Sequence, residues 1–322
     1  MKVKRHTWIQ ERDIEILRHI VNARILTVQE IEWLCFQEWR ARYRAAVELA
    51  QQTQQYITYE IARRARLRVK GMVDHGLLTR ITRTTERGVR QFKRLPDGYT
   101  ITSEGAVLLA TTDGIESKTI WTADQRGQAL QNMEHAIGIG TFYAALVTET
   151  TYRGVPITNW VADHLLARDY DRIPILGGID PYPVLPDATW VLNGHRYFLE
   201  YDRGTRPGAT WLKKARAYEG YRSTTKLNDR YATNQFTVLV VAPNSTRVKN
   251  IAEAVTKVTR TPPANYQFLI DALVHPTTIR RGWTTIQAVQ FTTRIIVHRP
   301  VEMPNIVFAP ATLWENPSAT SS

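Results

Sequence analysis

The chain has little cysteine and no long apolar run. Its 322 residues include one cysteine, Cys35, which by itself builds neither a disulfide framework nor a zinc site. Cys35 stands in an apolar stretch without an evident histidine to activate it, so we expect a buried structural thiol. A run of about eighteen apolar residues, which a membrane-spanning helix needs, is missing. The polar and basic start, Met1–His6, does not resemble a signal peptide, so we expect a cytoplasmic protein.

Acidic residues are fewer than basic residues. The chain has 42 lysine and arginine residues against 30 aspartate and glutamate residues, a net charge of +12. Such an excess favours polyanionic partners, either nucleic acid or an anionic membrane surface. A glycine-rich phosphate loop is missing, because Gly138 and Gly140 lie in a helical pattern, so ATP-driven chemistry has no support. The length suits two domains, each with its own core.

The first part of the chain predicts three helices. Apolar residues recur at helical spacing over residues 14–21. Thr27 followed by Glu30 forms a capping-box pattern before a second helix at 28–34. A third, arginine-rich helix is expected over residues 58–76.

A hairpin and a fourth helix are expected next. The composition becomes β-like at residues 77–82 and again at 99–102. The polar loop between them, residues 83–94, is rich in arginine and lysine. Ser103 is then expected to cap the fourth helix.

The third helix is expected to be amphipathic, with one apolar and one basic side. Its apolar positions would pack on one side of the helix: Ile61, Ala65, Leu67, Val69 and Met72. Its basic residues would project from the remainder: Arg63, Arg64, Arg66, Arg68 and Lys70. Between Glu60 and Arg94 eleven basic residues stand against three acidic residues, so the positive charge is concentrated here.

This order of helix, helix, basic helix and hairpin with a charged tip resembles the winged helix-turn-helix family. The Gly76-Leu77-Leu78 helix ending and the Tyr-x-Ile-Thr-x-Glu-Gly pattern at 99–105 are similar to the residues that separate helices and strands in that family. The resemblance implies DNA contacts in the major groove, with these candidates: Arg63, Arg64 and Arg68. It implies phosphate contacts from the wing, with these candidates: Arg83, Arg87, Arg90, Lys93 and Arg94. The alternative is a solvated helix face in a protein–protein module, and basic charge alone does not separate DNA from RNA.

A β-hairpin is the strongest local signal in the second half of the chain. β-forming runs flank Asn193-Gly194, the residue pair that favours a two-residue type I′ turn. Counting outward from this turn places Asp187 opposite Glu200, and side-chain alternation places Asp202 on the face of Glu200. Three carboxylates would then converge on one patch, where like charges repel one another. Such a patch needs a cation, either a hard metal ion such as Mg²⁺ or a lysine or arginine.

Several sources of positive charge lie near these acids in the sequence. A predicted helix at 211–218 offers Lys213 and Lys214. In the alternative interpretation the acids are solubility charges on an edge strand, neutralised by Arg196 or Arg203.

The remaining elements predict an α/β domain around a central mixed sheet. A helix at 133–147 carries small residues and should pack closely on the sheet. In this helix His135 is expected to be structural, and Glu134 is a further candidate acid for a metal site. Strands and a helix are expected at these positions: strands 155–162, 236–242 and 294–297, and helix 247–258.

These elements divide the chain into four parts. A winged helix-turn-helix domain is expected at 1–115 and a linker at 116–131. A PD-(D/E)XK-like α/β domain would follow at 132–310, with a flexible tail at 311–322.

The strand with Pro186-Asp187 and the Phe-Leu-Glu-Tyr-Asp-Arg-Gly-Thr run at 198–205 resemble the PD-(D/E)XK nuclease superfamily. Together with the winged helix, the His-bearing helix and the helix with Lys and Tyr, they resemble more narrowly the replication-relaxation family of plasmids and mobile elements. The resemblance implies that Asp187 and Glu200 bind Mg²⁺. Arg203 and Thr205 also match family positions, without an implied role.

The chain departs from the superfamily pattern in one place. Asp202 stands where a lysine usually follows the second acid by two positions. Lys213 or Lys214 would supply that charge from a migrated position. Alternatively, the site is a relic within a binding platform.

These resemblances leave three functions open. The first is a DNA-binding accessory protein of a plasmid or mobile element, acting in replication, relaxation or mobilisation with replication or transfer proteins. The second is a Mg²⁺-dependent endonuclease or nickase with these catalytic candidates: Asp187, Glu200, Asp202, Lys213 and Lys214. The third is a winged-helix transcriptional regulator that binds DNA as a homodimer. DNA rather than a membrane is the expected partner in all three, and Mg²⁺ would be a cofactor of the second alone.

Overall fold

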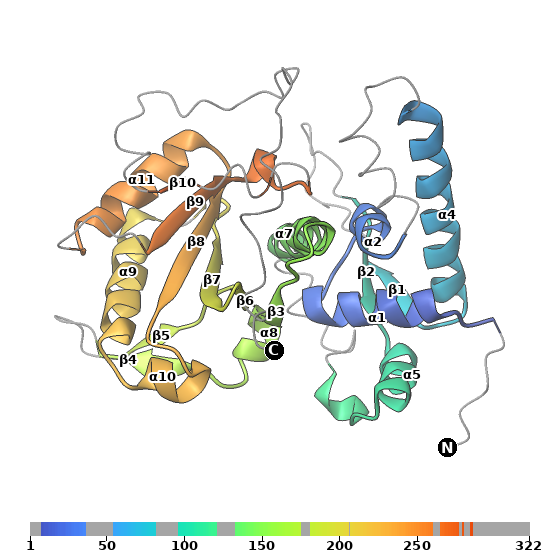
Figure 1. Ribbon diagram of the computed structural model, residues 1–322, viewed down its shortest axis with the longest axis horizontal. Coiled ribbons are helices and arrows are strands. Elements are labelled where there is room, and N and C mark those ends of the chain that lie inside the picture. Colours follow the sequence, from blue (N-terminus) through green and yellow to red (C-terminus); the bar gives the residue numbers. More distant parts are fainter. Residues whose placement is uncertain are drawn as a thin grey trace, which may run out of the picture. The chain divides into compact units, whose positions relative to one another are not determined.

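A central mixed sheet of six strands organises the described part of the chain (Figure 1). In spatial order its strands are β10 (Thr284–Thr285), β9 (Tyr266–Ile270), β8 (Phe236–Ala242), β7 (His195–Tyr201), β6 (Ala188–Leu192) and β3 (Thr158–Ala162). Strands β7, β8 and β9 run parallel to one another, while the other neighbouring pairs are antiparallel. Every residue of β8 is buried, as expected of a strand covered on both faces. The predicted α/β class with a central mixed sheet is confirmed.

The computed structural model describes these parts of the chain: residues 8–36, 54–81, 96–120, 133–174, 181–205, 207–259, 265–276, 279 and 284–285. All of them belong to one compact unit, Met1–Phe291. The basic loop at 83–94, the predicted strand at 294–297 and the predicted tail at 311–322 lie outside the described residues. None of the described helices has the length and apolar composition needed to cross a membrane.

The hairpin of β6 and β7 has the predicted turn and register. Asn193 and Gly194 have φ angles of 52° and 73°, the left-handed conformation that a type I′ turn needs at both positions. The pairing continues beyond β6, where the Asp187 N–H donates to the Leu199 carbonyl oxygen at 2.9 Å. This register places Asp187 beside Glu200 on the neighbouring strand.

Helices cover both faces of the central sheet (Figure 1). Helices α9 (Gly208–Arg222) and α11 (Ser245–Thr256) pack against each other over one face, while α7 (Met133–Tyr152) covers the other. All three lie where the sequence predicted helices. Because side chains alternate along β7, Glu200 points toward α9 and Tyr201 points toward α7.

The N-terminal elements are α1 (Glu11–Ala23), α2 (Val28–Cys35), α4 (Gln54–Asp74), the antiparallel strands β1 (Leu78–Ile81) and β2 (Gly98–Ile101), α5 (Ser103–Asp113) and the 3-10 turn η1 (Ser117–Thr119). The predicted capping box of α2 is present, because Glu30 Oε2 accepts a hydrogen bond from the Thr27 N–H at 2.7 Å. The predicted cap of α5 is wrong by one residue. The Thr102 hydroxyl oxygen accepts from the Gly105 N–H at 3.1 Å, and Ser103 is the first helical residue.

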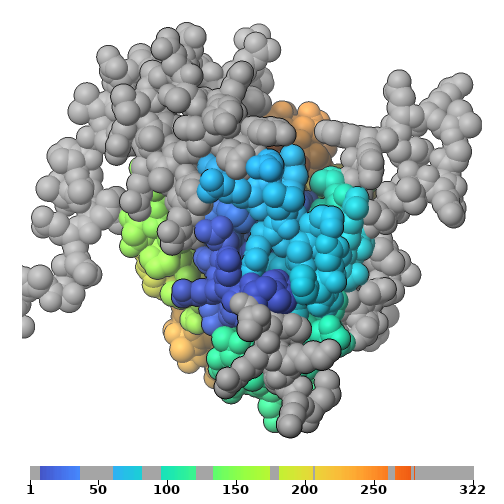
Figure 2. All heavy atoms as spheres, turned by 90° about the vertical axis from the view of Figure 1, so that its right-hand side faces the viewer, coloured from blue at the N-terminus to red at the C-terminus, as the bar shows by residue number. Residues whose placement is uncertain are grey.

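Helix α4, drawn in light blue in Figure 2, is two-sided as predicted, with one exception. Its inner side consists of buried residues: Ile61, Ala65, Val69 and Met72. Leu67 was expected to pack with them, but it is 56% exposed. It follows Arg63 by four positions, about one helical turn, and therefore shares the outer side with that residue.

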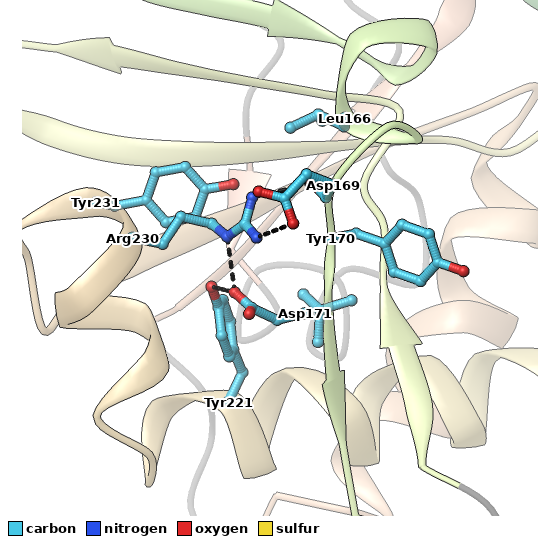
Figure 3. Close-up of a pocket in the computed structure, with 8 residues that line it drawn as sticks. Leu166, Asp169, Tyr170, Asp171, Tyr221, Arg230 and Tyr231 are labelled. Carbon is cyan, nitrogen blue, oxygen red and sulfur yellow. Dashed lines mark hydrogen bonds and ion pairs between the residues drawn. The ribbon is translucent and has the colours of Figure 1, made fainter.

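A small sheet of β4 (Asp171–Ile173) and β5 (Tyr182–Val184) is an element that the sequence did not reveal. A polar cluster lines a hollow beside β4 (Figure 3). Asp171 accepts hydrogen bonds from the Tyr221 hydroxyl at 2.6 Å and from Arg230 Nε at 2.8 Å, and Arg230 also pairs with Asp169 at 3.0 Å. These contacts join α10 (Lys226–Tyr231) to β4, with the single positive charge of Arg230 shared between the two carboxylates. The remaining short elements are α8 (Asp163–Leu166) and the 3-10 turn η3 (Asp271–Leu273).

The N-terminal helices and the sheet share one hydrophobic core. Buried side chains of α1, α2 and α4 belong to the same apolar cluster as those of α7, β6 and β7. The Trp160 indole N–H adds a hydrogen bond to the Asn22 carbonyl oxygen at 3.0 Å. The division into domains at 1–115 and 132–310, with a linker at 116–131, follows the order of the elements and stays a prediction.

Two glycines of α7 allow close packing on its neighbours. An added Cβ at Gly140 would lie 2.3 Å from the Ile25 carbonyl oxygen, and one at Gly138 would lie 2.4 Å from the Tyr201 ring. We expect Gly140→Ala to lower the free energy of unfolding by about 1–3 kcal/mol, because a backbone neighbour has little room to move. Gly71→Ala is the matched control, since its added Cβ meets no atom within 4 Å. That control should raise stability by up to about 1 kcal/mol in denaturant unfolding, and equal stability of both variants would contradict the packing.

Candidate functional site

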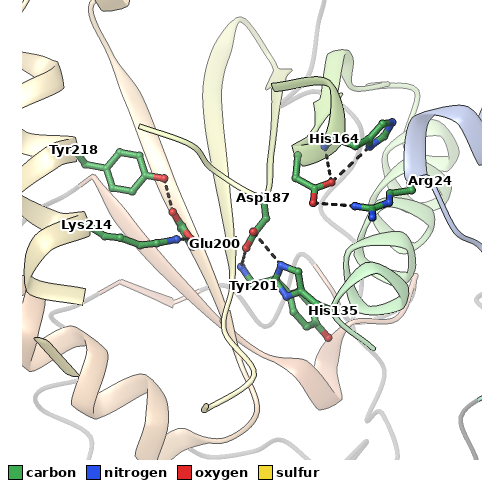
Figure 4. A network of polar contacts seen from close by, with 9 residues as sticks. Arg24, His135, His164, Asp187, Glu200, Tyr201, Lys214 and Tyr218 are labelled. Atoms are coloured by element: carbon green, nitrogen blue, oxygen red, sulfur yellow. Dashed lines mark hydrogen bonds and ion pairs between the residues drawn. The ribbon is translucent and has the colours of Figure 1, made fainter. Parts of the chain in front are cut away.

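Two acidic side chains lie next to each other where the pairing of β6 with β7 ends (Figure 4). Asp187 and Glu200 are 7% and 2% exposed. The Asp187 carboxylate accepts a hydrogen bond from the Tyr201 backbone N–H at 2.7 Å and contacts His135 Nε2 at 3.0 Å. His135 reaches this acid from α7 and is therefore one of its polar partners.

Glu200 is held from α9 on the other face of the sheet. Lys214 Nζ forms an ion pair with Glu200 Oε2, and the Tyr218 hydroxyl donates to Oε1 at 2.5 Å. Lys214 and Tyr218 are four residues apart, so they project from the same side of α9. Lys213 is exposed to solvent. Of the two lysines that were candidates from the sequence, the fold brings Lys214 to the acids.

Burial and neighbouring charge move the pKa values of the two acids in opposite directions. Burial raises the pKa of Glu200, while Lys214 opposes this rise and the nearby Asp187 carboxylate adds to it. Burial alone would also raise the pKa of Asp187, but His135, Lys214 and a backbone N–H outweigh it and lower that pKa. Asp187 is therefore the acid that stays ionised, and Glu200 takes a proton more readily.

The third acid, Asp202, has a separate set of partners. Arg247 of α11 donates from Nε and Nη2 to its two oxygens, each at 2.8 Å. Trp211 Nε1 donates to it at 2.8 Å and the Gly204 N–H at 2.6 Å. Burial would raise the pKa of Asp202, but these hydrogen bonds and the Arg247 charge lower it. The expected convergence of carboxylates therefore holds for Asp187 and Glu200, while Asp202 forms its own ion pair.

The arginines that stand close to these acids in the sequence bind elsewhere. The guanidinium carbon of Arg196 lies over the Tyr231 ring, 4.6 Å from its centroid. Arg203 forms an ion pair with Glu134, the residue considered as a further metal ligand. Lys214 therefore pairs with Glu200 and Arg247 with Asp202, and neither Arg196 nor Arg203 neutralises these acids as the alternative interpretation had it.

The donors around the two acids bear on metal binding. Mg²⁺ prefers carboxylate oxygens and keeps several waters. In the structure each carboxylate oxygen of Asp187 and Glu200 already contacts a donor, and Lys214 supplies positive charge. The pair therefore fits Mg²⁺ by ligand type, but the ion would require Lys214 to move away from Glu200.

Three residues that hold the acids were missed in the sequence: Trp211, Tyr218 and Arg247. Trp211, Lys214 and Tyr218 follow one another at spacings of three and four residues, which places them on one side of α9. That spacing is visible in the sequence and would have identified them. No local signal marks Arg247, which is 45 residues from Asp202 along the chain.

The basic residues of α4 form a second candidate surface. Four of them are exposed on the outer side of the helix: Arg63, Arg64, Arg66 and Lys70. Arg68, predicted to reach a DNA groove, instead pairs with the fully buried Asp13, and its Nη2 donates to the Trp8 carbonyl oxygen at 3.0 Å. Arg68 therefore holds α4 against α1. The wing candidates lie outside the described residues: Arg83, Arg87, Arg90, Lys93 and Arg94.

The two lysines of α9 should differ in their effect on stability. Lys214→Met removes the charge that balances the buried Glu200, and we expect the free energy of unfolding to fall by about 3 kcal/mol at neutral pH. Lys213→Met removes the same charge from an exposed position and should change that free energy by less than about 0.5 kcal/mol. Chemical denaturation measures both changes. Equal losses in the two variants would contradict the pairing of Lys214 with Glu200.

Comparison with known proteins bears on the family. No match was found among curated proteins. A family model described as replication-relaxation matches residues 17–239, which is more than half of the chain and includes α4, the hairpin acids and α9. The resemblance expected from the sequence is confirmed, and the chain belongs to the replication-relaxation family.

Proposed function

We propose that this protein binds the DNA of a plasmid or other mobile element and acts in its replication or relaxation. The observation that carries the proposal is the two-sided helix α4, which buries one side in the core and presents a basic side to solvent. The order α1, α2, α4, β1 and β2 supports a winged helix-turn-helix in which α4 is the recognition helix. Membership of the replication-relaxation family agrees with this role.

The outer side of α4 suits the major groove. Arg63, Leu67 and Lys70 follow one another at spacings of four and three, so they line the middle of that side. Arg64 and Arg66 flank them. In the groove the arginines would contact guanine edges or phosphates, and the exposed Leu67 would contact a thymine methyl group. That apolar contact would add base preference to a surface that otherwise binds by charge.

The second half of the chain is proposed to be a PD-(D/E)XK-like binding platform. The mixed sheet, the adjacent acids Asp187 and Glu200, and the helix that carries Lys214 support this fold. Because Lys214 and His135 already engage the acids, a non-catalytic role fits the contacts directly. The proposed partners of the platform are replication or transfer proteins, or a second copy of the chain.

Charge reversal on α4 tests DNA binding. Arg63→Glu/Arg64→Glu reverses charge on the proposed contact surface, and we expect at least about tenfold weaker binding to duplex DNA. The slope of log affinity against log salt should also fall by about two, because two phosphate-neutralising charges are lost. Lys213→Glu/Arg216→Glu changes the net charge equally on the exposed side of α9 and should weaken binding much less. Fluorescence anisotropy of a labelled duplex over a salt series measures both variants.

Other outcomes of this experiment would redirect the proposal. Equal weakening in the two variants would mean general electrostatic attraction without contact by α4. Unchanged binding in the α4 variant would place the interface elsewhere. Tighter binding to an RNA duplex of the same sequence would replace DNA by RNA as the partner.

A second candidate function is Mg²⁺-dependent DNA cleavage, favoured by the position of Lys214 beside both acids. Here Asp187 and Glu200 would hold the metal ion, and Lys214 would move from Glu200 to the phosphate and neutralise its charge. The parent protein should then nick or linearise supercoiled plasmid with Mg²⁺ or Mn²⁺, and Asp187→Ala and Glu200→Ala should lose this activity. Asp229→Ala, an exposed acid on α10, is the control and should cut as the parent does. Retarded but intact plasmid in every lane would exclude cleavage and leave the binding platform.

A further inference from the structure

Three side chains of metal-ligand type meet in the N-terminal part of the chain, apart from the hairpin acids. Glu15 and His19 are four residues apart on α1, and Cys35 is the last residue of α2. One ligand atom of each lies within 4.8 Å of the others. His19 Nε2 faces Glu15 Oε1 at 3.9 Å. The sequence did not reveal this cluster, because only the packing of α1 on α2 brings a histidine to Cys35.

A buried tyrosine orients the imidazole of this cluster. The Tyr143 hydroxyl lies 2.8 Å from His19 Nδ1 and accepts a hydrogen bond from Asn22 Nδ2 at 3.1 Å. When His19 donates its Nδ1–H to this hydroxyl, Nε2 keeps its lone pair on the side of Glu15. Metal-binding histidines have such a second hydrogen bond, which selects the tautomer and holds the ring. Burial, opposed by Asn22 and reinforced by Cys35, raises the pKa of Tyr143, so the phenol stays neutral.

The cluster opens toward solvent on one side. Cys35 is 2% exposed, whereas the side chains of His19 and Glu15 are 16% and 38% exposed. The thiol is therefore the inner group and the carboxylate the outer one. An ion would enter past Glu15, the most exposed of the three side chains.

We propose that Glu15, His19 and Cys35 bind a divalent ion of the Zn²⁺ class, with water in the fourth position. Thiolate and imidazole ligands select Zn²⁺ over Mg²⁺ and Ca²⁺, which prefer oxygen ligands. Zinc–ligand distances of about 2.0–2.3 Å require the three ligand atoms to move closer together when the ion binds. Binding releases the thiol proton of Cys35 to water, since the thiolate is the ligand.

Such an ion ties α1 to α2 in the part of the chain proposed to bind DNA. Because its ligands come from two helices, the site exists in the folded state alone, and metal binding stabilises that state. Tyr143 extends the link to α7. Metal binding here is independent of the DNA-binding role, so either can fail without the other.

Cobalt substitution tests the site in the full chain. Tetrahedral Co²⁺ with a thiolate ligand has a sulfur-to-cobalt charge-transfer band in the near ultraviolet. The chain has one cysteine, so this band reports on Cys35 alone. Titration should develop the band up to one ion per chain, and added Zn²⁺ should remove it by displacing Co²⁺. Absence of the band, or saturation at one ion per two chains, would overturn the proposal.

Matched variants separate this site from adventitious binding. His19→Ala and Cys35→Ser should each weaken Zn²⁺ binding more than about a hundredfold. Tyr143→Phe removes the hydrogen bond between the Tyr143 hydroxyl and His19 Nδ1 and should weaken Zn²⁺ binding about tenfold. Glu11→Gln, one turn from Glu15 on the exposed side of α1, should bind as the parent does. Competition with a chromophoric chelator measures these affinities. Parent-like affinity in both His19→Ala and Cys35→Ser would place the ion elsewhere and refute the assignment.

Thermal unfolding provides a second readout of the same site. Zn²⁺ should raise the Tm of the parent and of Glu11→Gln, whereas Mg²⁺ should not. Zn²⁺ should leave the Tm of His19→Ala and Cys35→Ser unchanged. If one of these variants is unfolded without metal, the other supports the comparison. If Zn²⁺ raised the Tm of the parent and of the folded variant equally, the assignment of these three residues as ligands would be wrong.

Discussion

Two acids buried side by side need balancing charge and hydrogen-bond donors, and helices on both faces of the sheet supply them. Asp187 and Glu200 meet because the Asn193-Gly194 turn sets the register of the hairpin. Their repulsion in a buried site is costly unless each has polar partners. Lys214 reaches Glu200 from α9, and His135 reaches Asp187 from α7 on the opposite face. Both helices therefore contribute a partner to the acids as well as apolar packing to the sheet.

Helix α7 is the element that links these acids to the N-terminal helices. Its first turn carries His135, which contacts Asp187, and Gly140 in its middle lies against the Ile25 backbone. One turn farther, Tyr143 bonds to His19 of the proposed zinc ligands. A shift of α7 would thus displace side chains at both the hairpin acids and the proposed zinc ligands, because a packed interior transmits displacement. The shared core makes the basic helix α4 part of the same mechanical unit.

The sequence by itself determined the elements whose signals are local. The Asn193-Gly194 turn predicted the hairpin register and with it the adjacency of Asp187 and Glu200. Apolar spacing predicted α7, helices were also predicted at α9 and α11, and a continuous apolar run predicted β8. The family resemblance came from the same short stretches. Such signals suffice because turns, helical periodicity and strand alternation depend on residues only a few positions apart.

Only the tertiary structure decided which charged and ligand groups meet. Lys213 and Lys214 are equivalent in the sequence, and the orientation of α9 selects the second. Asp202 takes Arg247 from α11, a helix far along the chain, in place of joining the other acids. Cys35 looks like an isolated thiol until α1 brings a histidine and a glutamate beside it. Ion pairs and metal ligands form between distant segments, so the side on which each element packs inward determines which groups come together.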